Sequence, residues 1–186
     1  MATKLDFDRL YADGGDPWEV TNSWYERRKY ALTLAALPRE RYRNGLELGC
    51  GFGAMSGLLH ERCDRLTAVD GSATAIGRAR SHFAGTEGLR FEHAVLPHEM
   101  PPVAVDLIVV SELLYYLSPA ELDELLDRLV GALEPGGDLV AVHFFSRNPL
   151  SYDGMEVHPR LRARPELVHV VTHEDEGFLL DVLRRS

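Results

Sequence analysis

Short apolar runs alternate with amphipathic stretches along the chain from residue 46 onward. In the run at 107–110 every residue is apolar, which is typical of a strand buried on both faces of a parallel sheet. Such runs predict seven strands, at residues 45–48, 66–69, 89–94, 105–110, 138–144, 167–172 and 178–183. Helical patterns lie between most of them at the spacing of β-α-β units, so we expect an α/β fold.

The clearest predicted helix follows Ser118. This serine suits the N-cap, Pro119 suits the first helical position, and Glu121 completes a capping box. An apolar face then repeats at helical spacing through Leu122, Leu125, Leu126, Leu129, Val130 and Leu133. The Pro-Gly-Gly turn at 135–137 is expected to end the helix and lead into the next strand.

The two ends of the chain differ in pattern. Residues 1–18 are polar and turn-rich and are predicted to form a loop or flexible lead, and a helix is predicted over 24–37. At the other end, only five residues, 173–177, join the last two strands, so this pair is predicted as an antiparallel hairpin.

The expected fold class is therefore α/β, a doubly wound seven-stranded mixed sheet of Rossmann-like type with a C-terminal antiparallel hairpin. We expect a single domain over 1–186. Residues 1–40 would form an N-terminal lid or helical lead, and 146–165 a loop insertion on the substrate side.

Composition narrows the range of partners. The 186 residues are 45% hydrophobic and 26% charged, which is ordinary for a globular chain. Lysine and arginine number 20 against 29 aspartates and glutamates, and the net charge of −9 argues against nucleic acid or an anionic membrane as a partner. No apolar run is long enough for a transmembrane helix, and residues 1–8 lack the apolar core of a secretory signal.

The cysteines and histidines indicate neither a disulfide-linked chain nor a metal site. Cys50 and Cys63 provide neither a disulfide framework nor a zinc site, and the histidines show no metal-ligand spacing. We therefore expect a reduced, cytoplasmic chain without a metal. It would act on a small-molecule substrate, as a monomer or a homodimer.

A glycine-rich loop follows the first predicted strand. Gly49, Gly51 and Gly53 lie in the turn before a helix, where glycine lets a ligand approach the main chain. Asp70 ends the next strand, 21 residues after Gly49, a separation typical of a carboxylate that binds a ribose diol. Glu47 precedes the loop; a carboxylate there favours a sulfonium cation such as S-adenosylmethionine and would repel a pyrophosphate.

A nicotinamide dinucleotide is the weaker alternative for this loop. Gly49, Gly51 and Ala54 match G-x-G-x-x-A, and Tyr25 with Lys29 imitates the Tyr-x-x-x-Lys pair of short-chain dehydrogenases. That pair precedes the glycine loop, however, where such chemistry does not place it. We interpret the charged stretch at 25–29 as a solvated helical face.

At these positions the sequence resembles a known family. Residues 47–53, Glu-Leu-Gly-Cys-Gly-Phe-Gly, resemble motif I of class I S-adenosylmethionine-dependent methyltransferases. Asp70 resembles their ribose-binding acid, and residues 133–137 resemble their post-helix turn. Three segments show a narrower resemblance, to the nodulation-protein-S (NodS) type of methyltransferase. They are residues 16–18 with 23–30, residues 111–117, and the tail from 143 through 157–158 to 178–182. That group is similar to N-methyltransferases that act on the free amine of a glucosamine unit in an oligosaccharide.

The resemblance implies a set of cofactor-binding residues. They are Trp18, Tyr25, Arg28, Glu47, Gly49, Cys50, Gly51, Gly53, Asp70, Gly71, Ser72, Val95, Leu96, Ser111 and Glu112. Trp18 and Tyr25 would cover the methionine end, or else simply pack an N-terminal helix on the domain. Arg28 would pair with the methionine carboxylate, or else is an exposed helical arginine. Val95 stands where the family commonly has an aspartate for the adenine amino group. We therefore expect the backbone of Val95 and Leu96 to bracket the ring with weaker affinity.

Four residues are candidates for the chemistry. His143 lies at the end of the fifth predicted strand, where α/β sheets present ligand-contacting residues. It would act as a base or orient the substrate. The alternative is a half-buried histidine bonded to the backbone. His158 lies in a turn-rich segment, 151–159, that would close over the substrate. Glu112 would contact a cationic amine or orient the cofactor. Of Tyr115 and Tyr116, one is expected to face the pocket, and Tyr116 joins the catalytic group.

The sequence therefore predicts an S-adenosylmethionine-dependent methyltransferase acting on a small polar acceptor, and the resemblance to the NodS type favours N-methylation of the amine of a sugar or sugar-like metabolite. An amine can lose its proton to water before attack, whereas a hydroxyl needs a base more urgently. An O-methyltransferase on a small hydroxyl- or carboxyl-bearing natural product is one alternative. A non-catalytic domain that binds S-adenosylmethionine is the other.

Overall fold

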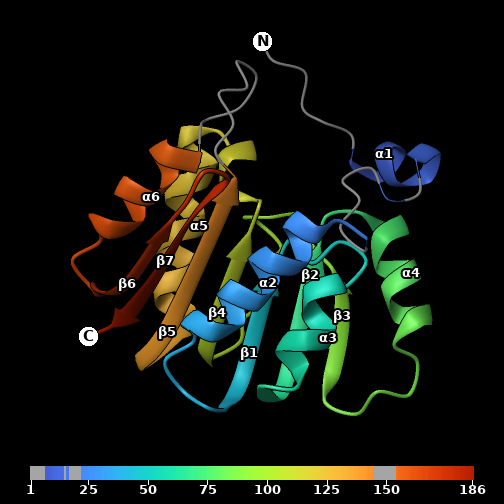
Figure 1. Ribbon diagram of the computed structural model, residues 1–186, viewed down its shortest axis with the longest axis horizontal. Helices are drawn as coiled ribbons and strands as arrows, with labels where there is room; N and C mark the ends of the chain where they lie inside the picture. The colour runs from blue at the N-terminus through green and yellow to red at the C-terminus, as the bar shows by residue number, and fades with distance from the viewer. Residues whose placement is uncertain (1–6, 15, 17–21, 145–153) are drawn as a thin grey trace.

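A mixed seven-stranded sheet forms the centre of the computed structural model, which describes residues 7–14, 16, 22–144 and 154–186 (Figure 1). The strand order is β3-β2-β1-β4-β5-β7-β6. The strands are β1 (Tyr42–Leu48), β2 (Cys63–Asp70), β3 (Leu89–His93), β4 (Val105–Ser111), β5 (Leu133–Phe144), β6 (Leu167–Glu174) and β7 (Phe178–Arg185). β1 to β5 pair in parallel, and β7 runs antiparallel between β5 and β6, which confirms the predicted mixed sheet and hairpin.

Helices cover both faces of the sheet. They are α1 (Phe7–Gly14), α2 (Trp24–Ala36), α3 (Ala54–His60), α4 (Ala73–His82), α5 (Pro119–Ala132) and α6 (Gly154–Arg162), with a 3-10 turn, η1, at Leu114–Tyr116. One core lies between the sheet and α2 with α3, and a second between the sheet and α5 with α6. β4 is buried along its whole length, as its uninterrupted apolar run predicts.

α5 has the predicted capping box. Ser118 Oγ accepts from the Glu121 backbone N–H at 3.4 Å, and the Glu121 carboxylate accepts from the Ser118 N–H at 2.9 Å. The helix ends at Ala132, earlier than the Pro-Gly-Gly turn, because Leu133 already pairs with β4 as the first residue of β5. Leu133 is buried in either role, so its apolar character does not distinguish the two.

Two helices replace segments predicted as loops. α1 occupies part of 1–18 and is anchored by tertiary contacts: the Asp8 carboxylate accepts from Ser72 Oγ at 2.6 Å and from the Thr74 N–H at 2.9 Å. α6 occupies part of the insertion predicted at 146–165 and contains Pro159. It forms because Val157 and Leu161 are buried in the core behind β5. Among the described residues no helix has the length and apolar character needed to cross a bilayer.

Candidate active site

The glycine loop links β1 to α3 at the carboxyl edge of the sheet, where open α/β sheets bind ligands. Gly49, Gly51 and Gly53 all have positive φ, at 76°, 53° and 86°. A Cβ on Gly51 would lie 2.9 Å from the Tyr11 hydroxyl of α1, so the loop has no room for a side chain there. α1 therefore packs over the loop, with Tyr11 stacked edge-on against Phe52 at a centroid distance of 4.6 Å.

Asp70 fixes this loop from the end of β2. Its carboxylate accepts from the Gly51 N–H at 2.9 Å and from the Ser72 N–H at 2.8 Å. Burial raises the pKa of this carboxyl, although the two N–H donors oppose the shift. Ser72 in turn caps α4, because its Oγ accepts from the Ala75 N–H at 3.1 Å. The Gly71 carbonyl lies 3.1 Å from His93 Nε2.

Glu47 has an unsatisfied carboxylate oxygen. Its side chain is 1% exposed, and Oε2 has no hydrogen-bond partner. Burial raises the pKa of Glu47 to about 8. A buried acceptor left without a partner is costly, and one placed two residues before a glycine loop indicates a ligand that brings a donor or a positive charge. This orphaned oxygen is the structural evidence that the residues present fit S-adenosylmethionine.

Other predicted cofactor residues lie around the same edge. Cys50 is buried beside the loop, and burial raises the pKa of its thiol well above the usual value, which keeps it protonated. Val95 is 41% exposed, and its N–H donates to Glu99 Oε2 at 2.7 Å, whereas Leu96 is nearly buried. Ser111 ends β4, and its carbonyl oxygen lies 3.3 Å from a Cβ built on Gly49.

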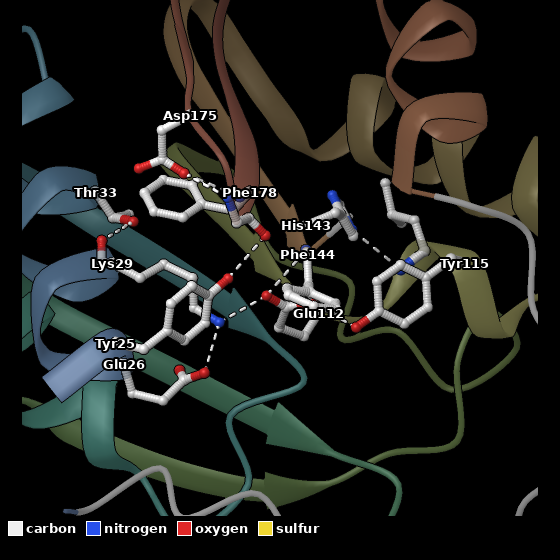
Figure 2. A network of polar contacts seen from close by, with 12 residues as sticks. Tyr25, Glu26, Lys29, Thr33, Glu112, Tyr115, His143, Phe144, Asp175 and Phe178 are labelled. Carbon is white, nitrogen blue, oxygen red and sulfur yellow. Dashed lines mark hydrogen bonds and ion pairs between the residues drawn. The ribbon is translucent and has the colours of Figure 1, made fainter. Parts of the chain in front are cut away.

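Lys29 is the centre of a polar network beside this edge (Figure 2). Its side chain is 1% exposed, and Nζ lies 2.9 Å from Glu26 Oε1 and 2.6 Å from Glu112 Oε1. The interpretation of 25–29 as a solvated face is therefore wrong: α2 turns Glu26 and Lys29 toward the sheet. The sequence signalled only an acid and a base three residues apart, a common surface pair.

Glu112 is held by an unusual backbone conformation. Its φ is 52°, a left-handed value that residues other than glycine rarely adopt. This bend directs the carboxylate away from β4 toward the end of β5, where it accepts from the Phe144 N–H at 3.1 Å and 3.0 Å. Tyr115 donates its hydroxyl hydrogen to the same carboxylate. The side chain stays 26% exposed, so one side of it remains open to a ligand.

Tyr25 and Arg28 lie at the turn between β6 and β7. The Tyr25 hydroxyl donates to the Gly177 carbonyl at 3.0 Å, and Arg28 forms an ion pair with Asp175. The structure thus places both beside the β6–β7 hairpin. Tyr116 packs edge-on against Phe7 of α1 at 5.1 Å. Trp18, the other predicted cover for the cofactor, lies outside the described residues.

His143 is fully buried, and both of its ring nitrogens are engaged. Nε2 accepts from the Leu114 N–H at 3.2 Å, and Nδ1 lies 3.0 Å from His158 Nε2. Burial lowers the pKa of His143 well below its usual value. Neither nitrogen is open to a substrate in this arrangement, so the expectation of a general base gives way to the alternative, a histidine bonded to the backbone.

His158 does not lie on a loop above the substrate. It belongs to α6, is fully buried, and faces His143 on one side and Asp181 on the other, with Nδ1 2.7 Å from Asp181 Oδ2. Periodicity did not predict this because residues 151–159 contain a proline and a glycine and few apolar positions. In the part of the chain that the structure describes, no group of histidine, cysteine and carboxylate side chains is arranged to hold a metal.

The fold and the site together define a class. A sheet with its last strand inserted antiparallel, a glycine loop after β1 and an acid at the end of β2 are the features of a class I S-adenosylmethionine-dependent methyltransferase. The family model of nodulation protein S (NodS) matches residues 4–148, and the chain belongs to this family.

Individual relatives agree with this assignment. Nodulation protein S of Rhizobium tropici is 35% identical over 127 residues, which are 67% of this chain and 53% of that protein. A presumed methyltransferase from Pseudomonas syringae has a solved structure with 45% identity and a TM-score of 0.78, covering 88% of this chain and 100% of that one.

The N-methyltransferase NodS from Bradyrhizobium japonicum WM9, solved with S-adenosyl-L-homocysteine, is 28% identical with a TM-score of 0.85. The match covers 100% of this chain and 99% of that one. Against the Rhizobium tropici relative, by contrast, this chain spans about half the length.

Proposed function

We propose that this chain is an S-adenosylmethionine-dependent N-methyltransferase whose acceptor is the amine of a sugar or sugar-like metabolite. The observation that carries the proposal is the Glu112 carboxylate, which is partly exposed beside the glycine loop. The NodS family membership supports the same reaction. Two buried free cysteines are compatible with a reducing, cytoplasmic location.

The cofactor part of the proposal rests on the glycine loop and its neighbours. When bound, S-adenosylmethionine supplies a methyl group on a positively charged sulfur. Glu47 would hold the cationic end of the methionine portion with its unpartnered oxygen, and Asp70 would hold the ribose diol. The main chain at Val95 and Leu96 would bracket the adenine.

The charge balance favours a cationic acceptor. Glu26 and Glu112 contribute two negative charges and Lys29 one positive charge, which leaves one negative charge in excess. In a partly buried site this excess attracts an ammonium group and repels a carboxylate. Phe144, whose N–H donates to Glu112, is 42% exposed and offers an aromatic surface next to the carboxylate. Such a surface suits a cation or the apolar face of a sugar ring.

The state of the histidines favours nitrogen over oxygen as the nucleophile. An amine needs only to be neutral at the moment of attack, and its proton can pass to water or be held by the Glu112 carboxylate. A hydroxyl needs a strong acceptor in contact with it. His143 and His158 are buried and bonded to other groups, so neither is available for that task.

A titration followed by an acceptor screen tests the proposal. The chain should bind S-adenosylhomocysteine and not NADH in isothermal titration. With labelled S-adenosylmethionine it should methylate a glucosamine oligosaccharide that has a free 2-amino group and leave the N-acetylated form of the same oligosaccharide unmodified. Methylation of hydroxy acids instead would establish the O-methyltransferase. Binding of the cofactor without transfer to any acceptor would favour a non-catalytic domain.

A further inference from the structure

Three buried side chains form a hydrogen-bonded series behind the proposed acceptor site. His143 comes from the end of β5, His158 from α6 and Asp181 from β7, and all three are 0% exposed. The series begins at the Leu114 N–H, which donates to His143 Nε2 at 3.2 Å. It continues between His143 Nδ1 and His158 Nε2 at 3.0 Å and ends between His158 Nδ1 and Asp181 Oδ2 at 2.7 Å.

The chemistry of the two ends determines where the protons lie. A backbone N–H can only donate, so His143 Nε2 is an acceptor, and the hydrogen of the neutral ring sits on Nδ1. His143 Nδ1–H then donates to His158 Nε2, and His158 Nδ1–H donates to Asp181. Every hydrogen bond in the series points toward the carboxylate.

Asp181 is held as an anion by cationic and hydroxyl donors. Arg162 donates to it from Nε at 2.7 Å and from Nη2 at 2.8 Å, and Thr172 Oγ1 donates at 2.6 Å. A carboxylate with these partners accepts and does not donate, so it fixes the tautomer of His158 as carboxylates fix the tautomer of metal-bound histidines. In a buried series each bond also polarises the next.

The other end of the series reaches the acceptor site. Leu114 begins η1, the turn that follows Glu112 and contains Tyr115, and the Tyr115 hydroxyl donates to the Glu112 carboxylate. The His143 ring packs edge-on against Tyr115 with a centroid distance of 5.4 Å. The hydrogen bond to Leu114 therefore fixes the turn that presents both side chains.

We propose that His143, His158 and Asp181 are positioning residues: the carboxylate sets both rings in the Nδ1–H tautomer, and His143 thereby holds the Leu114 N–H and the turn that shapes the acceptor site. The link to the amine acceptor rests on the proposed function. The tautomers and the hydrogen bond to Leu114 do not depend on it. None of the three side chains touches the reacting atoms.

Nuclear magnetic resonance of the 15N-labelled chain tests the proton arrangement directly. Both histidines should show the Nδ1–H tautomer at neutral pH, with their signals assigned by loss in single variants. An Nε2–H tautomer or a doubly protonated ring at either position would overturn the proposal. In Asp181→Asn the Nδ1–H share of both rings should fall; unchanged tautomers would refute the part given to Asp181.

Two substitutions at His143 separate its acceptor from its donor. In His143→Gln the longer side chain keeps an oxygen near the position of Nε2, whereas in His143→Asn the side chain reaches only the position of Nδ1 and leaves the Leu114 N–H unpaired. Hydrogen exchange at Leu114 should be slow in the wild type and in His143→Gln and faster in His143→Asn. Equal exchange in the two variants would contradict the proposal whatever the acceptor is.

The same pair gives a kinetic test with the free-amine glucosamine oligosaccharide as the probe. His143→Asn should raise KM for the oligosaccharide by about tenfold while kcat and the affinity for S-adenosylhomocysteine stay within about twofold. His143→Gln should restore most of the difference. An equal loss in both variants, or a loss that falls on cofactor affinity, would indicate a merely structural role. If the wild type does not methylate this probe, the proposed function fails, while the tautomer and exchange measurements still decide this inference.

Discussion

Lys29 and Glu112 lie 83 residues apart in the sequence, and their charged groups meet at 2.6 Å. The lysine side chain is almost fully buried and is shared with Glu26. This ion pair ties α2 to the end of β4 and holds the carboxylate that we place in the acceptor site. The glycine loop and this ion pair lie at the edge of the sheet where we place the methyl donor and the proposed amine acceptor.

Replacing Lys29 by methionine should destabilise the fold strongly. Removing one partner of a buried ion pair leaves two carboxylates without compensation, which costs about 3–5 kcal/mol. Urea unfolding measures this cost. Arg28→Met is the matched control on the same helix, because Arg28 and its ion pair with Asp175 are much more exposed and should contribute at most about 1 kcal/mol. Equal losses in the two variants would contradict a buried role for Lys29.

Replacing Glu112 by glutamine should weaken the use of the amine acceptor. The amide oxygen can still accept from the Phe144 N–H, but the excess negative charge of the cluster is lost. We expect kcat/KM for the free-amine oligosaccharide to fall by about 100-fold, with the affinity for S-adenosylhomocysteine little changed. Steady-state kinetics and titration give the two values. Glu124→Gln, at an exposed position on α5, serves as the control, and a similar fall there would argue against the assignment.

Burial of Glu47 should lower the free energy of unfolding at neutral pH relative to acidic pH. A buried carboxyl with a raised pKa favours the folded state when it is protonated. That contribution is complete below the ordinary pKa of 4.5 and is lost as the pH rises through about 8. The free energy of unfolding should therefore decline across this range in the wild type and decline less in Glu47→Gln. The same variant should bind S-adenosylhomocysteine more weakly. A variant that is neither more stable at high pH nor weaker in binding would refute both roles.

An aspartate at position 95 should strengthen cofactor binding. Val95 is exposed at the edge of the sheet where the family commonly has an acid for the adenine amino group. One added hydrogen bond to a charged acceptor should lower the Kd for S-adenosylhomocysteine by about tenfold. Titration of Val95→Asp against Val168→Asp, an exposed position on β6, measures the gain. No gain would mean that the adenine lies elsewhere.

Much of the fold could be predicted because it depends on local patterns. The apolar run of β4 and the capping box of α5 both reflect short-range rules, and both are present in the structure. The short connection at 173–177 likewise leaves only a hairpin between β6 and β7. α1 and α6 could not be predicted in this way, because they are stabilised by contacts with distant segments, such as the bond between Asp8 and Ser72.

The residues of the candidate site that belong to a sequence motif could be predicted, and those that are brought together by packing could not. Glu47 and the glycine loop form one contiguous motif, Asp70 follows it at the end of the next strand, and the Asp70 carboxylate bonds the Gly51 N–H of that loop. The charges at 25–29 predict a solvent-exposed face, whereas Lys29 is buried, because charge spacing on a helix does not show which face is buried. The strand pattern predicts His143 near the end of β5, where the structure has it, but its partners His158 and Asp181 come from elements whose approach the sequence does not reveal.

The atom that receives the methyl group tests the central claim most directly. The chain would be incubated with 13C-methyl S-adenosylmethionine and the free-amine glucosamine oligosaccharide, and the product examined by carbon and proton correlation spectroscopy. A single labelled methyl on the 2-amino nitrogen, absent with the N-acetylated oligosaccharide and strongly reduced in Glu112→Gln, is the predicted result. A labelled methyl on a hydroxyl oxygen, or equal labelling of the two oligosaccharides, would contradict the assignment of Glu112 and its neighbours to an amine.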